Sequence, residues 1–383
     1  MTLAELLSNE DLRRHEFPVA RDKVFLAHAG VCPLPRRVSE AVRDYAALCA
    51  RGDQEALLPA LQIQHSRRLA ARILDAKPDE IAFVGPTSLA LSFVAAGLPL
   101  KKNDNVLIYF DDYPANVYPW MALAEKGVEV RFLNVREMGR IRPTEVISQV
   151  DEQTRLVALA SCHFVSGYRI DLSAIGQALH QRNILFCVDA IQTLGAFPTT
   201  VEHVDFLAAD AHKWLLGPCA AGIFFVRRSL QDRLRPIALG WHNVRCPDYV
   251  PREEMVFRTD ARRYEAGTQN LLGLVGLHAA LELLLEIGID NIAADLLRKR
   301  TLLVAGIQAK GYQVLHAEAP PGNRGGITTF HRDGADMAAL EKKLEAADII
   351  ASLRTDRGGR KYLRFSPHFY NTDAELERAL ELL

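Results

Sequence analysis

This chain has no excess of charge of either sign. Its 383 residues carry 46 Lys and Arg against 47 Asp and Glu, for a formal net charge of -1. Nucleic-acid-binding proteins usually have a basic surplus, so we expect no nucleic-acid partner. The chain also lacks an uncharged apolar run of about 18 residues, which argues against a membrane-spanning helix. Its charged N-terminal segment has no apolar core typical of a secretory signal.

Cysteine is scarce, and no two of the six cysteines are spaced as a Cys-x-x-Cys pair. This spacing argues against a zinc ribbon or a redox dithiol. Six cysteines in a chain of this length are also too few for a disulfide framework. Together with the missing signal segment, this composition predicts a cytoplasmic protein with reduced cysteines.

Several common ligand motifs are also missing. The sequence contains no GxGxxG fingerprint and no GxxxxGK[ST] loop, which argues against a nicotinamide dehydrogenase and a P-loop nucleotidase. It contains no GxSxG, HExxH or EF-hand motif either, and we expect no metal site. An α/β protein without these motifs must use the ends of its strands in another way.

Apolar residues make up 49% of the chain, enough to form a large buried core. Short β-rich runs alternate with helical patterns over residues 80–227, and most runs are apolar along their whole length. Such runs suit strands that are buried on both faces of a parallel sheet. The predicted strands are residues 80–84, 106–110, 128–133, 156–160, 184–188, 204–208 and 223–226.

The pattern changes after residue 270, where a long helical stretch leads into shorter strands and helices. We therefore predict two domains. Residues 17–270 form a large α/β domain, and residues 271–383 form a smaller α+β domain that the N-terminal helix, residues 1–16, joins.

Two charged residues follow neighbouring predicted strands. Asp189 ends the run ILFCVD, and Lys213 follows the run VDFLA within the segment AADAHKWLL. Taken alone, Asp189 could be a helix N-cap and Lys213 a solvated lysine. Together they meet the needs of pyridoxal 5'-phosphate, which uses a lysine amine for a Schiff base and a carboxylate beside its pyridinium nitrogen.

The segment SGYRIDL…CVDAIQTLGAFP…VDFLAADAHKWLLGP resembles the class V aminotransferase family of pyridoxal-phosphate enzymes. This family includes cysteine desulfurases, kynureninases and isopenicillin N epimerase-like proteins. The resemblance continues in FLAHAGVCPLP, VGPTSLALSFVA, DDYPANVYPW, RRYEAGTQN and YLRFSPHFYNT, and so covers nearly the whole chain. It implies fold type I, in which a mostly parallel seven-stranded sheet is joined to a smaller C-terminal α+β domain.

The resemblance also implies roles for residues around the cofactor. Lys213 would form the internal aldimine and move the substrate's α-proton, while Asp189 would pair with the pyridine nitrogen. Gln192 would approach the phenolic oxygen of the ring, His212 would reach the phosphate, and Tyr113 would stack on the ring.

Further residues follow from the same resemblance. Thr87 and Ser88 open a predicted helix after a strand, where free backbone amides and the helix dipole favour a phosphate. Thr268 would reach the phosphate of a neighbouring subunit, which implies a homodimer. His163 stands where relatives place an amide near the ring oxygen, or it is a satisfied core histidine. His28 lies in a segment that often lines the substrate pocket.

An amino-acid substrate is implied by Arg364, which matches the arginine that binds the α-carboxylate, since a guanidinium can bind a carboxylate through two hydrogen bonds. The preceding loop contains further cations, among them Arg354. They could form a solvated basic loop or recognise an acidic group on the substrate.

One departure from the family concerns the reaction. Cysteine desulfurases carry a nucleophilic cysteine shortly before the carboxylate-binding arginine, whereas this chain has no cysteine after Cys246. A desulfurase mechanism through that thiolate is therefore not expected. A class V aminotransferase is the first interpretation. A β-elimination C–S lyase, an epimerase and a partner protein without turnover are the alternatives.

Overall fold

A seven-stranded sheet forms the centre of the larger unit in the computed structural model, which describes residues 1–58 and 60–383. The strand order is β2-β8-β7-β6-β5-β3-β4, and pairing is parallel from β7 through β4. β8 pairs antiparallel with both of its neighbours. The strands are β2 Ile81–Val84, β3 Asn105–Ile108, β4 Glu129–Phe132, β5 Thr154–Ala160, β6 Leu185–Asp189, β7 Phe206–Ala209 and β8 Gly222–Val226. The mostly parallel seven-stranded sheet predicted from the sequence is confirmed.

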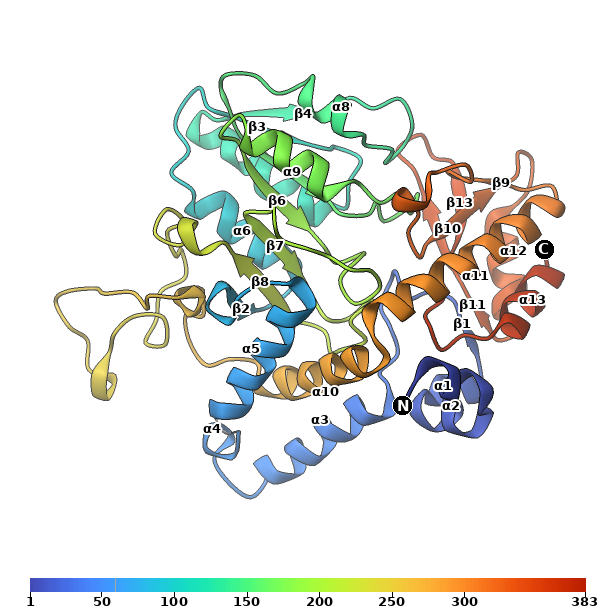
Figure 1. The fold of residues 1–383 in the computed structure, drawn as a ribbon, viewed down its shortest axis with the longest axis horizontal. Helices are drawn as coiled ribbons and strands as arrows, with labels where there is room; N and C mark the ends of the chain where they lie inside the picture. Colours follow the sequence, from blue (N-terminus) through green and yellow to red (C-terminus); the bar gives the residue numbers. More distant parts are fainter. Residues whose placement is uncertain (59) are drawn as a thin grey trace.

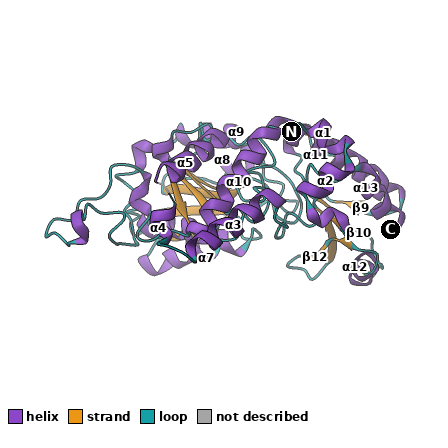
Figure 2. Cartoon of the chain, turned by 90° about the horizontal axis from the view of Figure 1, so that it is seen from below, coloured by secondary structure: helices purple, strands orange, loops and turns teal. Residues whose placement is uncertain are grey.

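Helices cover both faces of this sheet, and in Figure 2 the strands lie between them. β5 shows why its run is apolar throughout. Leu156 and Ala158 enter the core on one face, with residues of α6 (Thr87–Gly97), whereas Val157 and Leu159 enter the core on the other. Because successive side chains of a strand point to opposite faces, a strand covered on both sides needs apolar residues at every position.

The remaining helices connect and cover these layers. Their bounds are α1 Leu3–Ser8, α2 Glu10–Glu16, α3 Arg36–Cys49, α4 Gln54–Leu57, α5 Ala60–Leu74, α7 Tyr118–Met121, α8 Pro143–Ile147, α9 Leu172–His180, α10 Leu271–Ile287, α11 Ile289–Ala309, α12 Met337–Glu345 and α13 Asp373–Glu381. Short 3-10 helices are η1 Pro18–Arg21, η2 Pro78–Glu80, η3 Pro114–Asn116, η4 Ala122–Lys126, η5 Arg228–Leu230, η6 Pro247–Tyr249, η7 Ala261–Tyr264 and η8 Pro321–Asn323.

The smaller unit is built on a four-stranded antiparallel sheet of order β12-β13-β10-β9. α10 and α11 lead from the large unit to this sheet, and both chain ends lie on its side of the molecule (Figure 1). β1, near the N-terminus, pairs in parallel with β11 of the smaller unit. The exact domain boundaries stay a prediction. The strands are β1 Val24–Phe25, β9 Gln313–Val314, β10 Thr328–His331, β11 Ile349–Ile350, β12 Ser352–Thr355 and β13 Lys361–Phe365.

Gly288 makes the break between α10 and α11 possible, because its φ of 89° is unfavourable for residues with a side chain. Within the described part of the chain, no single helix is both long and apolar enough to cross a membrane. α10 and α11 meet the length and composition criteria together, but they are bent by 76°.

Candidate active site

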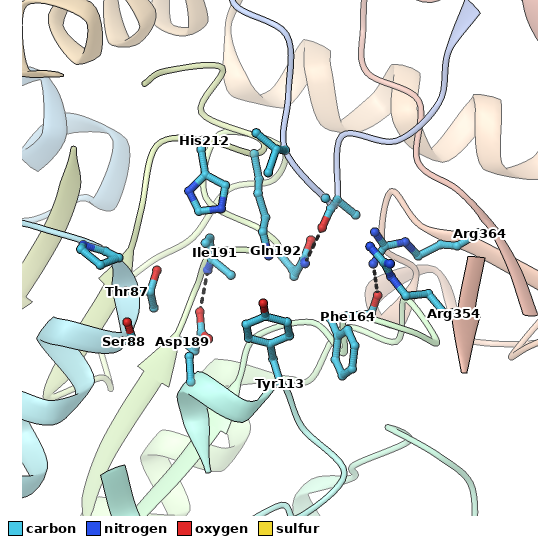
Figure 3. Close-up of a pocket in the computed structure, with 16 residues that line it drawn as sticks. Thr87, Ser88, Tyr113, Phe164, Asp189, Ile191, Gln192, His212, Arg354 and Arg364 are labelled. Carbon is cyan, nitrogen blue, oxygen red and sulfur yellow. Dashed lines mark hydrogen bonds between the residues drawn. The ribbon is translucent and has the colours of Figure 1, made fainter. Parts of the chain in front are cut away.

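A cavity of about 460 Å³ lies between the strand ends of the large unit and the hairpin β12–β13. Small-molecule sites in proteins typically fall within about 300–1,000 Å³. Figure 3 shows Thr87, Ser88 and His212 toward one end, Arg354 and Arg364 at the other, and Asp189 and Tyr113 between them. The lining residues are Ala29, Gly30, Val31, Pro86, Thr87, Ser88, Tyr113, Ala115, Phe164, Asp189, Ile191, Gln192, His212, Lys213, Arg354 and Arg364.

Asp189 is the last residue of β6, and its side chain faces the cavity although it is only 2% exposed. One carboxylate oxygen accepts a hydrogen bond of 3.0 Å from the Ile191 amide. Burial nevertheless raises the pKa of Asp189, because no side chain among the described residues forms an ion pair with it. The cavity therefore presents a buried carboxylate that a cationic ring nitrogen would satisfy.

Lys213 lies beyond the end of β7 and is 7% exposed. Burial lowers the pKa of its amine to about 8, and Asp189 partly opposes this effect. Nζ lies 5.2 Å from the ring centroid of Tyr113, which is 47% exposed and follows β3. A lysine with a lowered pKa has a larger neutral, nucleophilic fraction at physiological pH.

The other end of the cavity is built for an anion. α6 begins at Thr87, and its N-cap residue, Pro86, makes no side-chain capping bond. The amides of Thr87 and Ser88 at the helix start therefore remain available to a phosphate, whereas the Leu89 amide donates to the Pro86 carbonyl. The Thr87 hydroxyl accepts a bond of 2.9 Å from the Asp210 amide, which fixes the helix start against the segment that carries Lys213.

Asp210 orients His212 at this end without lining the cavity itself. The imidazole Nδ1 lies 2.8 Å from Oδ2 of Asp210, which leaves Nε2 for another partner. Backbone amides of Ala211, Ala220 and Ala221 also donate to the same carboxylate. These bonds satisfy the Asp210 carboxylate within the protein and hold it away from the cavity.

Gln192 lines the cavity with its amide held in a fixed orientation. Its Nε2 donates to the Ala29 carbonyl at 3.1 Å, and its Oε1 accepts from the indole of Trp214 at 2.9 Å. These two bonds leave one amide hydrogen on Nε2. That hydrogen is the group available for the phenolic oxygen proposed from the sequence.

Arg364 is fully buried, and its guanidinium is only partly satisfied. Nη1 donates to the Phe164 carbonyl at 2.5 Å, whereas Nε has no hydrogen-bond partner among the described residues. Burial lowers the pKa of Arg364 well below its ordinary value, and Arg354 adds to this effect. A buried guanidinium without a carboxylate partner is a strong candidate for binding a carboxylate ligand.

Three residues proposed from the sequence are not among the residues that line this cavity in the described chain. His163 lies behind the wall, bonded to the Asp111 carbonyl and to Ser166, and burial lowers its pKa to about 4. His28 is buried between the Ser366 carbonyl and the Tyr370 hydroxyl. Both imidazoles have partners on both nitrogens, as expected of core histidines.

Thr268 lies in a neighbouring cavity, together with the adjoining residues 267–270. Gly85 and Leu89, which flank the turn at residues 86–88, also line that cavity. Thr268 is therefore near the phosphate end of the site but separated from it within one chain. Its role toward a second copy stays a prediction.

The sequence analysis missed Asp112, which holds the turn that carries Tyr113. Its carboxylate accepts from the amides of Tyr113 and Ala160 and from the Asn116 side chain. Burial and the nearby Asp189 raise the pKa of Asp112 to about 7. The sequence did contain a signal for Asp112, because it is an acidic residue that follows the predicted strand at residues 106–110. Gly30 and Phe164, which also line the cavity, left no such signal.

The residues present fit pyridoxal 5'-phosphate. An uncapped helix start suits its phosphate, a buried carboxylate without a cation suits its ring nitrogen, and a buried amine suits its aldehyde. All three groups line a single cavity. Pyridoxal phosphate supplies the electron sink in enzymes that hold it this way.

Comparison with known proteins finds similar sequences and similar folds. A probable cysteine desulfurase of Methanothermobacter thermautotrophicus is 31% identical over 98% of both chains. The structure of an apo cysteine desulfurase from Thermococcus onnurineus has a TM-score of 0.88 at 22% identity, covering 97% of this chain and 96% of that one.

Two structures of C-DES have a TM-score of 0.85, at 21% and 22% identity. They cover 96% and 95% of this chain and 98% of theirs. One is a complex of this cystine C–S lyase with its product cysteine persulfide, and the other is a mutant with glycine covalently linked to the PLP cofactor. The model of the family named aminotransferase class-V matches residues 24–379. The chain therefore belongs to the class V aminotransferase family, whose cofactor is pyridoxal 5'-phosphate.

Proposed function

We propose that this protein is an aminotransferase that acts on an amino acid. The observation that carries the proposal is the single cavity lined by Lys213, Asp189 and Arg364. Transamination requires a lysine that attaches the cofactor, a carboxylate that keeps its ring protonated, and a group that binds the substrate carboxylate. These three side chains supply those functions.

Each side chain has a defined task. Pyridoxal phosphate, when bound, stabilises the electron pair left at the substrate's α-carbon. Lys213 Nζ would hold the cofactor through its aldehyde, and its free amine would move the proton at the substrate's α-carbon. Asp189 would keep positive charge on the ring nitrogen, since its buried carboxylate forms no ion pair with a side chain in the described part of the chain. Arg364 would bind the α-carboxylate, and Tyr113 would lie against the cofactor ring.

The 31% identical relative is a probable cysteine desulfurase, but the residues of this chain support that activity less well. No cysteine follows Cys246 in the chain, and the segment between β12 and β13 is a short turn over residues 356–360. Burial raises the thiol pKa of both Cys32 and Cys162 to about 12, so neither thiol forms a thiolate readily.

A C–S lyase is the second candidate. The cavity has the groups that would hold the cofactor but no thiol on the β12–β13 turn, and this favours a lyase as much as a transaminase. Both reactions require the same lysine and the same electron sink. C-DES, with the same overall fold, is described as a cystine C–S lyase. An epimerase would need a second acid or base across the α-carbon from Lys213, and Tyr113 is the candidate for that role.

We also propose that the protein works as a homodimer. Thr268 would then reach the phosphate site of the other subunit from the neighbouring cavity. Size-exclusion chromatography with light scattering tests this proposal, and a monomeric holoenzyme would contradict it.

The reaction is tested by adding amino acids to the purified holoenzyme and recording its absorbance. Conversion to the pyridoxamine form with release of a 2-oxo acid supports the aminotransferase. Release of ammonia and a 2-oxo acid with the lysine-bound cofactor restored indicates the lyase. Lys213→Ala is the control and should lose the absorbance band of the lysine-bound cofactor. A protein without that band after addition of pyridoxal phosphate would refute the proposal.

A further inference from the structure

A second arginine stands beside the buried Arg364 in the cavity. The Nη2 atoms of Arg354 and Arg364 both lie 3.8 Å from the position that a Cβ at Gly30 would occupy. The two atoms are therefore at most twice that distance apart. Gly30 leaves the space between the two guanidinium groups and the cavity open.

The register of the β12–β13 hairpin puts both arginines on one face. Ser352 pairs with Arg364, and Arg354 pairs with Tyr362, so Arg354 and Arg364 are diagonal neighbours. Side chains of diagonal neighbours point the same way, and long ones meet. The hairpin holds both guanidinium groups at the same end of the cavity, away from Thr87 and Ser88 (Figure 3).

Neither guanidinium forms an ion pair with a carboxylate of the described residues. Arg354 donates to the Leu353 carbonyl and Arg364 to the Phe164 carbonyl, and no ion pair to a carboxylate is formed by either among residues 1–58 and 60–383. The other arginines of this hairpin, Arg357 and Arg360, differ from Arg354 and Arg364. Arg357 pairs with Asp111 and covers Phe110, and Arg360 approaches Asp333. None of these three loop contacts lies on the cavity wall.

One α-carboxylate does not require two guanidinium groups, since a single fork binds it through two hydrogen bonds. We infer that the substrate carries a second acidic group on its side chain, and that Arg354 binds it while Arg364 binds the α-carboxylate. The substrate class is thus a dicarboxylic amino acid. This inference rests on the proposed function, because it names the substrate of the same site.

Two ligands without an amine separate this inference from the reaction. Succinate and butyrate have the same number of carbons but differ by one carboxylate. Isothermal titration of the holoenzyme should show succinate binding about 10- to 100-fold more tightly than butyrate, as expected for one added charged hydrogen-bond pair. Arg354→Gln should remove this preference, and Arg354→Lys should retain part of it.

Arg357→Gln is the matched control, since it removes an arginine of the same hairpin that does not line the cavity. It should bind both ligands as the wild type does. An Arg354→Gln variant that weakens succinate and butyrate equally would mean that both arginines share one carboxylate, and would overturn the inference. A circular dichroism melt of each variant identifies a folding defect. If Arg354→Gln is misfolded, the succinate preference of Arg354→Lys tests the inference instead.

Turnover distinguishes the two proposals. Wild-type turnover of aspartate or glutamate in preference to alanine supports both. Selective succinate binding without turnover of any amino acid supports the second acidic subsite and refutes the aminotransferase. Turnover of alanine with equal binding of succinate and butyrate refutes the subsite alone.

Discussion

The reactivity of Lys213 gives the sharpest test of the site. Burial lowers the pKa of its amine to about 8 from an ordinary value of 10.5. At pH 7 the neutral fraction is then about 9%, against about 0.03% for an ordinary lysine, a gain of about 300-fold. This difference corresponds to about 3 kcal/mol of lost stabilisation of the charged amine.

The rate of covalent attachment of pyridoxal phosphate to the apoenzyme follows this neutral fraction. The rate should therefore rise with pH and level off above about 8, because the amine loses its proton through that range. Stopped-flow absorbance at a fixed cofactor concentration measures the rate at each pH. A profile still rising at pH 10 would refute the lowered pKa.

Asp189→Asn adds a directional test. Asp189 raises the pKa of Lys213, so its removal should move the midpoint of the profile below 8. The amide keeps the shape of the side chain and can still accept the bond from Ile191. Asp111→Asn changes a carboxylate that does not line the cavity, so it should leave the midpoint unchanged. Because ionisation of pyridoxal phosphate itself affects both variants equally, a shift seen in Asp189→Asn alone comes from the protein. The same midpoint in Asp189→Asn would refute the electrostatic coupling.

Three further predictions concern the residues that support the site. Glu265→Gln should lower the free energy of unfolding in urea by about 3–5 kcal/mol, because it leaves the buried Arg67 guanidinium without its ion-pair partner; an unchanged midpoint contradicts this. Asp210→Ala should cost about 2–4 kcal/mol in the same assay, since several amides lose their acceptor, and should slow cofactor attachment; a loss below about 0.5 kcal/mol refutes it. Gly139→Ala should lower the melting temperature, because φ is 73° and the added Cβ would stand 2.4 Å from a buried side-chain carbon. Gly322→Ala, with open space around it, should melt as the wild type does.

The central sheet was predictable because its signal is local. Each strand of the large unit is covered on both faces, so its burial is recorded in consecutive apolar residues, as in β6 and β8. β4 is the exception, with charged residues in a half-exposed edge strand, and its run was still found through Val128 and Leu133. The pairing of β1 with β11 was not predictable, because two-residue strands far apart in sequence have no pattern of their own.

The cofactor end of the site was predictable for a related reason. Asp189 and Lys213 follow neighbouring parallel strands, so their strand ends must lie on one edge of the sheet. The roles of His28 and His163 could not be read in this way. A histidine within a motif can either line a cavity or lie behind its wall. His28 and His163 are held behind the wall by hydrogen bonds to Ser366 and Asp111, which belong to segments distant in sequence.

The substrate end depends on register, which the sequence alone does not specify. Residues 354–361 contain four cationic side chains. Successive side chains of a strand alternate between the two faces of the sheet, so the sequence alone does not say which of these cations faces the cavity. The pairing of Ser352 with Arg364 decides among them by placing Arg354 on the same face as Arg364. A shift of one residue in the turn would reverse the face that Arg354 presents. If Arg354 and Arg364 bind the substrate as proposed, a hairpin of the smaller unit selects the substrate, while the groups proposed to hold the cofactor come from the large sheet, so one can change without the other.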